Sequence, residues 1–360
     1  MKSLLRSTVL AAVLGTALGG LPAMGDPAVP TFDDIVAAAK KEGKLNAWIF
    51  YPAKPETQRA VINAFNARFG LNTEVTWVAT SPVTALTTAI AESKGGRVTV
   101  DIIAGSEEEV AGAVNSGIVK SFPWSQVFAG QFPLVAALEA SVIKAYEGKA
   151  LPYMAYHYGI AWNPNSIADG EVPSKFVDLA DPKWKGRFGF NSIFMNPAPM
   201  IAPVTGSPAA IDLSRKIFAN KPVFARGTPA VAQAVVNGTV PIGVTGFPVA
   251  EAGIRKGEPL RFKLFDDYIP VAMENLVVLE NAPHPNMARL FSAWFAGEGY
   301  AIADKYEPMP VPADLKSKIS QMVVERVAAG AILAATADPK DLETTAKVRD
   351  AVSLMMSGQN

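Results

Sequence analysis

The chain of 360 residues contains no cysteine, and this absence excludes disulfide bonds, thiol catalysis and cysteine-ligated metals. Histidine is almost as rare, because only His157 and His284 occur, and this argues against a histidine-rich metal site. An excess of charge is lacking too, since Lys plus Arg and Asp plus Glu number 33 each. Nucleic-acid-binding proteins need a basic face, so the balanced charge argues against a nucleic-acid partner.

Catalytic fingerprints are also missing from the sequence. No segment matches G-x-S-x-G, H-E-x-x-H, G-x-x-x-x-G-K-[ST] or G-x-G-x-x-G. A hydrolase is the competing class, and it would have His157 as its only plausible base. A single histidine in an aromatic strand is more often a hydrogen-bonded structural residue. We therefore expect a protein that is not an enzyme and that has no cofactor.

The N-terminus carries the pattern of an export signal. Lys2 and Arg6 precede a short apolar segment at 9–18, and a small-x-small cleavage site follows at 23–25. The apolar run is too short to remain as a membrane anchor, and without cysteine there is no site for a lipid anchor. These features predict a signal peptide over residues 1–25 and a free periplasmic protein.

The remaining chain is rich enough in apolar residues to bury a large core. Hydrophobic residues make up 49% of the sequence, and the length favours two domains. Expected strands at 44–52, 72–80 and 98–105 alternate with expected helices. Ser106 and Glu109 form a capping box before the helix that follows the third strand. Such alternation indicates right-handed crossovers and a parallel, doubly wound sheet.

A second α/β region follows later in the chain. Its expected strands lie at 186–191, 221–229 and 239–248, and a long extended segment occupies 261–280. The apolar-rich stretch 323–336 contains charged residues, so it predicts a packed amphipathic helix and not a membrane span.

The two α/β regions are joined by the stretch LPYMAYHYGIAWNPNSI, residues 151–167. Tyr156 and Tyr158 share one face of this expected strand, whereas His157 lies on the other, and an Asn-Pro-Asn segment ends it. Polar-tipped rings on a strand between two open sheets are typical of a crossing that lines a cleft between lobes. The alternative is an edge strand whose tyrosines only cover the rim of a core.

Several stretches resemble bacterial extracellular solute-binding proteins of ABC importers, in the branch that includes ferric-iron-binding proteins. They are YHYGIAWNPNSI (156–167), PSKFVDLADPKWKGRFGF (173–190), VNGTVPIGVTGFPVAEAGIRKGEPL (236–260) and VLENAPHPNMARLFSAWFAGEGYAIADKY (278–306). The resemblance implies a two-lobed, type II periplasmic-binding fold, in which each lobe is an open, mainly parallel sheet flanked by helices. It also implies a protein that closes on a small-molecule ligand and hands it unchanged to an inner-membrane permease.

The resemblance and the strand pattern together divide the mature chain at two hinge crossings, near residues 155 and 270. Lobe 1 is expected to contain residues 26–155 and 271–305. Lobe 2 is expected to contain residues 156–270 and 306–360. The ligand cleft lies between the lobes, and we expect the protein to act as a monomer.

The candidate ligand-binding residues lie at strand ends, at helix starts and on the two crossings. Free N–H groups and the positive dipole end at helix starts suit an oxygen-rich or anionic ligand, although capping alone also explains any single one. Arg226 and Lys54 could complement such a ligand, or they could be solvated loop residues. Glu274 would have to be paired if it is buried, with one of these cations or with a cationic ligand group. The full set is Tyr51, Lys54, Ser81, Ser106, Tyr156, Tyr158, Asn196, Arg226, Thr245, Phe247, Tyr268 and Glu274.

Ferric iron is the alternative ligand within the resembled branch. Those relatives bind iron through phenolates, typically an adjacent tyrosine pair at the start of the helix after a GVTG-like strand. Here that place is occupied by Phe247 and Pro248, which offer no ligand oxygen. We therefore expect a small organic anion of the carboxylate or phosphonate class, with no bound metal.

Overall fold

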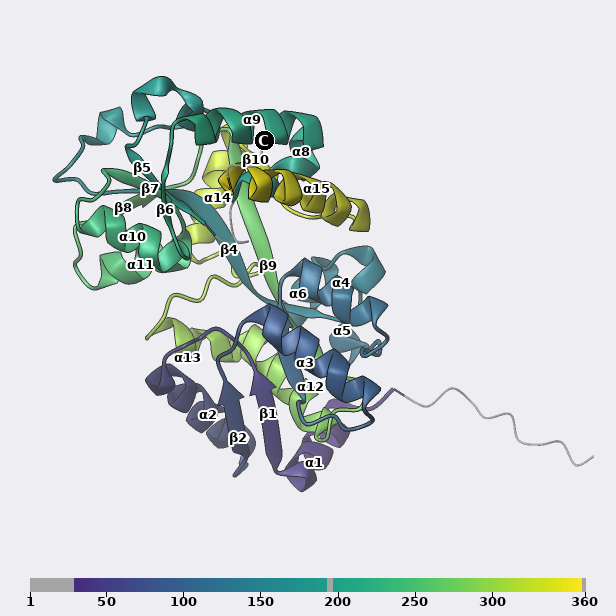
Figure 1. Ribbon diagram of the computed structural model, residues 1–360. Helices are drawn as coiled ribbons and strands as arrows, with labels where there is room; N and C mark the ends of the chain where they lie inside the picture. The colour runs from purple at the N-terminus through teal and green to yellow at the C-terminus, as the bar shows by residue number, and fades with distance from the viewer. Residues whose placement is uncertain (1–28, 193–196, 358–360) are drawn as a thin grey trace, which may run out of the picture.

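The computed structural model describes residues 29–192 and 197–357, and two lobes are joined by long strands (Figure 1). The expected signal peptide and Asn196 lie outside the described residues. No helix within these two ranges is long and apolar enough to cross a membrane.

Lobe 1 begins with alternating strands and helices, as the sequence predicts. Its strands are β1 (Lys44–Trp48), β2 (Glu74–Val78) and β3 (Ile102–Gly105), and its first helices are α1 (Phe32–Glu42), α2 (Pro55–Phe69), α3 (Pro82–Lys94), α4 (Glu107–Asn115), α5 (Trp124–Phe128) and α6 (Leu134–Ala140). Later in the chain, α12 (Pro285–Trp294), a π-helical turn (Phe295–Gly299) and α13 (Tyr300–Asp304) return to this lobe. Local signals bound the first helix: Thr31 forms a capping box before α1, and Gly43 ends that helix with a φ of 65°.

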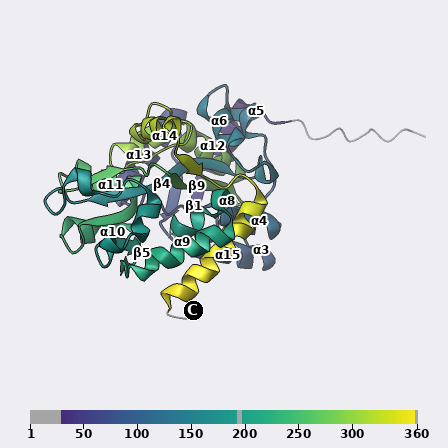
Figure 2. The same cartoon turned by 90° about the horizontal axis from the view of Figure 1, so that it is seen from above.

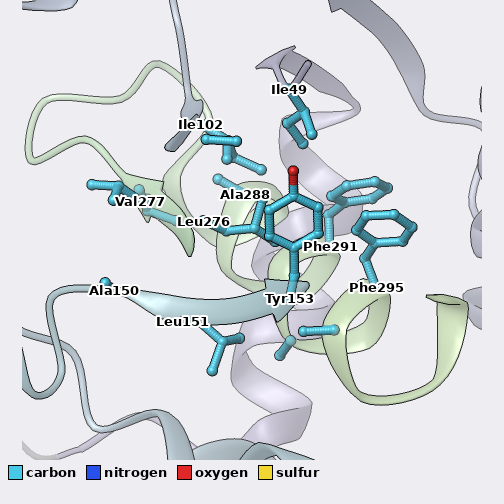
Figure 3. Packing of buried hydrophobic residues seen from close by; sticks show 14 of the residues in the cluster. Ile49, Ile102, Ala150, Leu151, Tyr153, Leu276, Val277, Ala288, Phe291 and Phe295 are labelled. Atoms are coloured by element: carbon cyan, nitrogen blue, oxygen red, sulfur yellow. The ribbon is translucent and has the colours of Figure 1, made fainter. Parts of the chain in front are cut away.

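One hydrophobic cluster fills lobe 1 and includes the first half of the crossing strand β4 (Leu151–Trp162). Aromatic rings are in contact within this core, where Phe65 lies 5.2 Å from Phe291 and 5.2 Å from Trp294 between ring centroids. Figure 3 shows Tyr153 of β4 among these side chains, with its hydroxyl pointing toward Ile49. The crossing strand is therefore anchored in the lobe 1 core.

The two crossing strands, β4 and β9 (Tyr268–Val278), form the centre of the molecule. β4 pairs antiparallel with β9 from Leu151 to His157 and then with β7 (Ile242–Gly246) from Tyr158 to Trp162. All residues of β4 are buried, and β4 has neighbours on both sides. The alternative of an edge strand is therefore wrong. We propose that the lobe boundary on β4 lies where the strand changes partner, between His157 and Tyr158.

Lobe 2 has a second, mainly parallel set of strands. They are β5 (Phe188–Asn191), β6 (Val223–Ala225), β7 and the short β8 (Arg261–Lys263). The helices around them are α7 (Pro197–Met200), α8 (Ala202–Thr205), α9 (Ser207–Ala219), α10 (Thr228–Val236), α11 (Phe247–Arg255), α14 (Lys318–Ala328) and α15 (Pro339–Met356). In Figure 2, which looks down on this lobe, α9 and α15 lie side by side, and their residues are in contact.

A single sheet path connects both lobes in the order β2-β1-β3-β9-β4-β7-β5-β6. β8 pairs with β4, and β10 (Ile332–Ala334) pairs with β9. The expected two-lobed fold is confirmed. The helix expected over 323–336 is only partly correct, because α14 ends at Ala328, Gly330 follows with a φ of 104°, and β10 begins at Ile332.

A third segment, 305–317, also passes between the lobes, and the sequence did not predict it. Met309 and Val311 pack in the lobe 1 cluster, and the N–H group of Ala155 donates to Pro310 O at 2.7 Å. These contacts lead us to propose that residues 306–311 belong to lobe 1, whereas the sequence-based boundary places them in lobe 2. We propose that lobe 2 resumes after Val311.

Candidate functional site

The strand registers bring the carboxyl ends of both sets of parallel strands to the space between the lobes. β3 runs antiparallel to β9 and ends at Gly105, opposite Asn275, and β7 runs antiparallel to β4 and ends at Gly246, opposite Tyr158. Asn275 and Tyr158 both lie within the crossing strands. The starts of α4 and α11 therefore face this space from opposite lobes, where ligands of open α/β sheets bind.

Tyr156 is the centre of the candidate site. Its hydroxyl lies 2.6 Å from the Thr228 hydroxyl at the start of α10, and its ring lies 5.1 Å from that of Tyr158. The ring packs on the backbone of Gly246 so closely that a Cβ there would lie 1.7 Å from Tyr156 Cε1. Glycine is therefore required at the end of β7 for the crossing tyrosine to reach α10.

Carboxyl groups gather on the lobe 1 side of Tyr156. Glu274 is 3% exposed, and burial, together with the nearby Glu109 and Glu107, raises its pKa well above the usual range. Burial also raises the pKa of Glu107 to about 7, although its Oε1 accepts the Met273 N–H at 3.3 Å. Neither Arg226 nor Lys54 pairs with Glu274 in the described part of the chain, and its pairing with a cationic ligand group stays a prediction.

A cavity of about 50 Å³ lies between the lobes at the start of α4. Glu107 lines it from lobe 1, Ala272 lines it from β9, and Arg349 lines it from α15 of lobe 2. The Arg349 guanidinium pairs with Glu108 across the lobes. Thr345 also lines the cavity, and its buried Oγ1 has no hydrogen-bond partner in the part of the chain that the structure describes.

The hydroxyls predicted to bind ligand are already engaged within the protein. Ser81 accepts the Thr84 N–H at 3.2 Å and caps α3, and Ser106 forms the capping box of α4. Thr245 is fully buried and donates to Thr228 O at 3.2 Å. These side chains therefore have a role within the protein, which is to hold the helix starts in place.

The two candidate cations differ in their surroundings. Arg226 precedes α10, is exposed, and forms no ion pair within the described part of the chain. At the start of α2, the N–H groups of Ala53 and Lys54 donate to the Glu307 carboxylate at 3.2 and 3.0 Å. Glu307 therefore occupies this helix start with a carboxylate of the protein itself. The sequence did not predict this contact, because Glu307 is separated from Ala53 by 254 residues and from Lys54 by 253 residues.

Three other candidate residues pack within the protein. Phe247 joins a small lobe 2 cluster with Leu264, and Tyr268 packs against the main lobe 2 cluster. The Tyr51 hydroxyl donates to Pro308 O at 2.8 Å in the third crossing segment. Asn196 lies outside the described residues.

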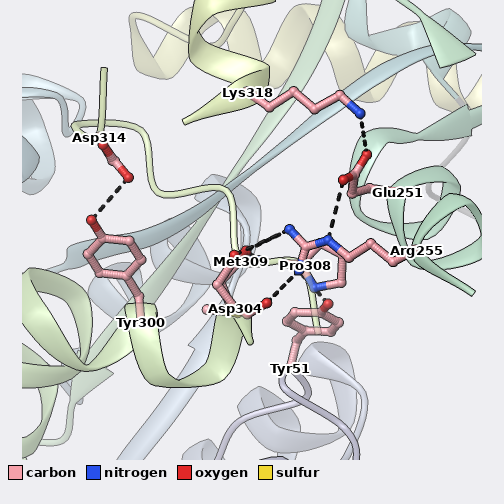
Figure 4. A network of polar contacts seen from close by, with 9 residues as sticks. All are labelled: Tyr51, Glu251, Arg255, Tyr300, Asp304, Pro308, Met309, Asp314 and Lys318. Atoms are coloured by element: carbon pink, nitrogen blue, oxygen red, sulfur yellow. Dashed lines mark hydrogen bonds and ion pairs between the residues drawn. The ribbon is translucent and has the colours of Figure 1, made fainter. Parts of the chain in front are cut away.

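A polar network closes the inter-lobe space on the side of α11 and α13 (Figure 4). Arg255 of lobe 2 binds Asp304 of lobe 1 at 3.2 Å, and Glu251 binds Lys318 at 2.7 Å. A neighbouring cavity of about 230 Å³ is lined by both lobes.

His157 is buried within the crossing strand β4. Burial lowers its pKa to about 4, and its Nδ1 has no hydrogen-bond partner among the described residues. Among the described residues, no group of three or more His, Asp or Glu side chains is placed to hold a metal ion.

Comparison with known proteins identifies a matching family and a curated relative. A family model described as bacterial extracellular solute-binding protein matches residues 60–316. The Fe(3+)-binding periplasmic protein of Serratia marcescens is 26% identical over 183 residues, which cover 46% of this chain and 54% of that protein. The chain thus matches about half the length of this relative.

Solved structures with the same fold cover most of the chain. Iron-bound HitA from Pseudomonas aeruginosa is 20% identical with a TM-score of 0.60, covering 80% of this chain and 99% of that one. AfuA from Actinobacillus pleuropneumoniae, with fructose-6-phosphate bound, is 15% identical with a TM-score of 0.64, covering 88% and 98%.

Proposed function

The chain belongs to the family of bacterial extracellular solute-binding proteins, and on that premise we propose that it is the periplasmic binding component of an ABC importer. It captures a small organic anion of the carboxylate or phosphonate class between its lobes. It then delivers the unchanged ligand to a permease in the inner membrane.

The assignment of an anionic ligand rests on the first turns of two helices in lobe 2. α10 and α11 begin after Gly227 and Gly246, without a side-chain cap and without an acidic residue in the first turn. Their N–H groups and dipole ends favour negative charge. Arg226, exposed beside α10, adds a planar donor fork that suits a carboxylate or phosphonate.

The ligands of the two structural neighbours differ, and of the two only the sugar phosphate is an oxygen-rich anion. AfuA was solved with a sugar phosphate and HitA with iron. For this chain, phenolate coordination of ferric iron is disfavoured, because burial raises the pKa of Tyr51 and of Tyr156. The hydroxyls of both residues also have partners within the protein.

A thermal-shift screen over carboxylates, phosphonates, polyamines and ferric citrate tests the proposal, because a ligand that binds only the native state raises Tm. We expect the anions to raise Tm, and ferric citrate to produce no visible phenolate-to-iron band. A strong band that is lost in Tyr156→Phe would overturn the anion assignment in favour of iron.

Calorimetry on Arg226→Ala then tests the binding site. Removing a charged partner from a buried anion costs about 2–5 kcal/mol, or about 30- to several-thousand-fold in Kd. Arg215→Ala is the matched control, because Arg215 is also exposed in lobe 2 but lies on α9. Wild-type affinity in Arg226→Ala would contradict the proposed site. Small-angle scattering with and without the ligand tests whether the lobes close on it.

A further inference from the structure

The two walls of the inter-lobe space have opposite electrostatic character. On lobe 1, the first turn of α4 contains Glu107, Glu108 and Glu109, and the start of α2 is occupied by Glu307. On lobe 2, the first turns of α10 and α11 contain no acidic residue, and Arg226 stands beside α10. One wall therefore favours positive charge and the other favours negative charge.

The crossing strands add buried oxygen atoms that have no partner. Glu274 Oε2 and the Tyr158 hydroxyl are both buried, and neither has a hydrogen bond in the described structure. Leaving such atoms unpaired is costly, so buried polar groups nearly always have a partner. The unpaired carboxyl oxygen at the crossing is therefore open to a hydrogen-bond donor from a ligand or from water.

The geometry of the crossing brings these two kinds of group within reach of one small molecule. Tyr156 connects the start of α10 to β4 through the Thr228 hydroxyl. On the neighbouring strand Ala272 lies opposite Tyr156, and Glu274 lies two residues further along, opposite Met154. Residues two apart on a strand lie on the same face, about 6–7 Å from each other. A single tyrosine side chain therefore separates the anion-binding helix start from the carboxyl group.

We propose that the ligand is a small zwitterion, whose anionic group binds the start of α10 with Arg226 and whose amine faces Glu107 and Glu274. The amine supplies the donor that Glu274 Oε2 lacks. The rings of Tyr156 and Tyr158 lie beside it and attract a cation through their faces. This inference rests on the proposed function and adds the second charge of the ligand.

Calorimetry with matched pairs tests the inference on the mature protein. 2-Aminoethylphosphonate is compared with ethylphosphonate, and β-alanine with propionate, and ethylamine serves as the bare amine. In at least one pair we expect the amine-bearing member to bind at least about tenfold tighter, because close buried charge pairs couple by more than about 1.4 kcal/mol.

Each other outcome overturns a distinct part of the assignment. Equal or tighter binding of the anions without an amine overturns the zwitterion inference and leaves the proposed function intact. Binding of ethylamine without any anion overturns both, and so does the absence of binding by all five probes.

Variants of the carboxyl wall give an independent readout. Glu107→Gln and Glu274→Gln should reduce the preference for the amine-bearing member from about tenfold toward onefold, while the affinity for the plain anion stays the same or rises. Glu74→Gln is the matched control, because Glu74 is an exposed carboxylate on β2 with the same change in charge. An unchanged preference in both wall variants, with melting transitions that show folded protein, would overturn the inference.

Discussion

The two lobes share an α/β design but differ in how their cores are assembled. Lobe 1 has one continuous cluster, in which rings from α2, α12 and the π-helical turn are in contact. Lobe 2 divides its buried residues among three smaller clusters. Two of these depend on the C-terminal elements, since Val348 of α15 belongs to one and Ile319 of α14 belongs to another. The core of lobe 1 is therefore continuous, whereas the core of lobe 2 also needs residues from the C-terminal part of the chain.

Core truncation should show the largest difference between the lobes. Phe65→Ala should destabilise lobe 1 near the upper end of about 3–5 kcal/mol, and Phe188→Ala in lobe 2 nearer the lower end. Phe65 has three ring neighbours, whereas Phe188 has one in the described structure. Urea denaturation of both variants measures this, with the exposed Val83→Ala as control. Equal losses of unfolding free energy in the two phenylalanine variants would contradict this difference between the lobe cores.

The next largest loss of stability is expected when the contact between Tyr156 and lobe 2 is disturbed. Gly246→Ala places a methyl group against the Tyr156 ring, so we expect a loss of about 1–3 kcal/mol in unfolding free energy. The displaced ring should also weaken ligand binding. Gly170→Ala is the control, because a Cβ there meets nothing within 4 Å and no positive φ is present. Similar stabilities of the two variants would show that the Tyr156 ring moves aside for the added methyl group at little cost.

The acidic wall of lobe 1 should produce a pH effect that lobe 2 lacks. Glu107 has an ordinary pKa of 4.5, and burial raises it to about 7, so the folded state binds more protons between these values. The contribution of Glu107 to stability should therefore fall as pH rises through that window, by a fraction of about 1.4 kcal/mol per pH unit because the residue is only half-buried.

Urea denaturation across this pH window measures the effect. Glu107→Gln should lose this falling contribution. Glu274, whose pKa burial also raises, contributes a slope of the same sign, whereas His157, whose pKa burial lowers from 6.5 to about 4, contributes a rising slope between these two values, so the difference between Glu107→Gln and the wild type is the quantity to compare. Glu74→Gln should retain the wild-type slope. A Glu107→Gln profile identical to that of the wild type would mean that the carboxyl is solvated in the folded protein.

The ion pairs between the lobes should have the smallest effect on stability. Arg349→Ala and Arg255→Ala should each cost about 0.2–1 kcal/mol, because both pairs are partly exposed and screened. If these pairs hold the lobes together, small-angle scattering at low salt should show a larger radius of gyration for these two variants than for the wild type. Lys44→Ala removes a pair within lobe 1 and should leave the radius unchanged. An effect of Lys44→Ala equal to the others would contradict a role in closure.

Local signals predicted most of the fold. The cap at Ser106 and the buried run of β3 are interactions between near neighbours, and each is present. Strand ends and helix starts are local features too, so the sequence can place the candidate site residues at them, but which of these residues bind a ligand stays a prediction. The aromatic stretch 156–158 was also identified correctly as a crossing within the sheet.

The partners of the site residues could not be predicted, because they depend on contacts between distant segments. Glu307 fills the start of α2, Thr245 is directed to Thr228, and Phe247 turns into a lobe 2 cluster. A sequence shows that a hydroxyl is present at a helix start, but it does not show which acceptor lies opposite. Burial without a counter-ion at Glu274 likewise results from the packing of α4 against β9.

The sequence by itself determined the class of the protein: the absence of cysteine, the alternation of strands and helices, and the stretches that resemble solute-binding proteins are properties of composition and order. Only the tertiary structure decided the charge of each cleft wall. That charge depends on which carboxyls are desolvated and which helix starts are already occupied. Desolvation and occupancy are set by segments far apart in the chain, so they exist only once the lobes have folded and the crossings are in place.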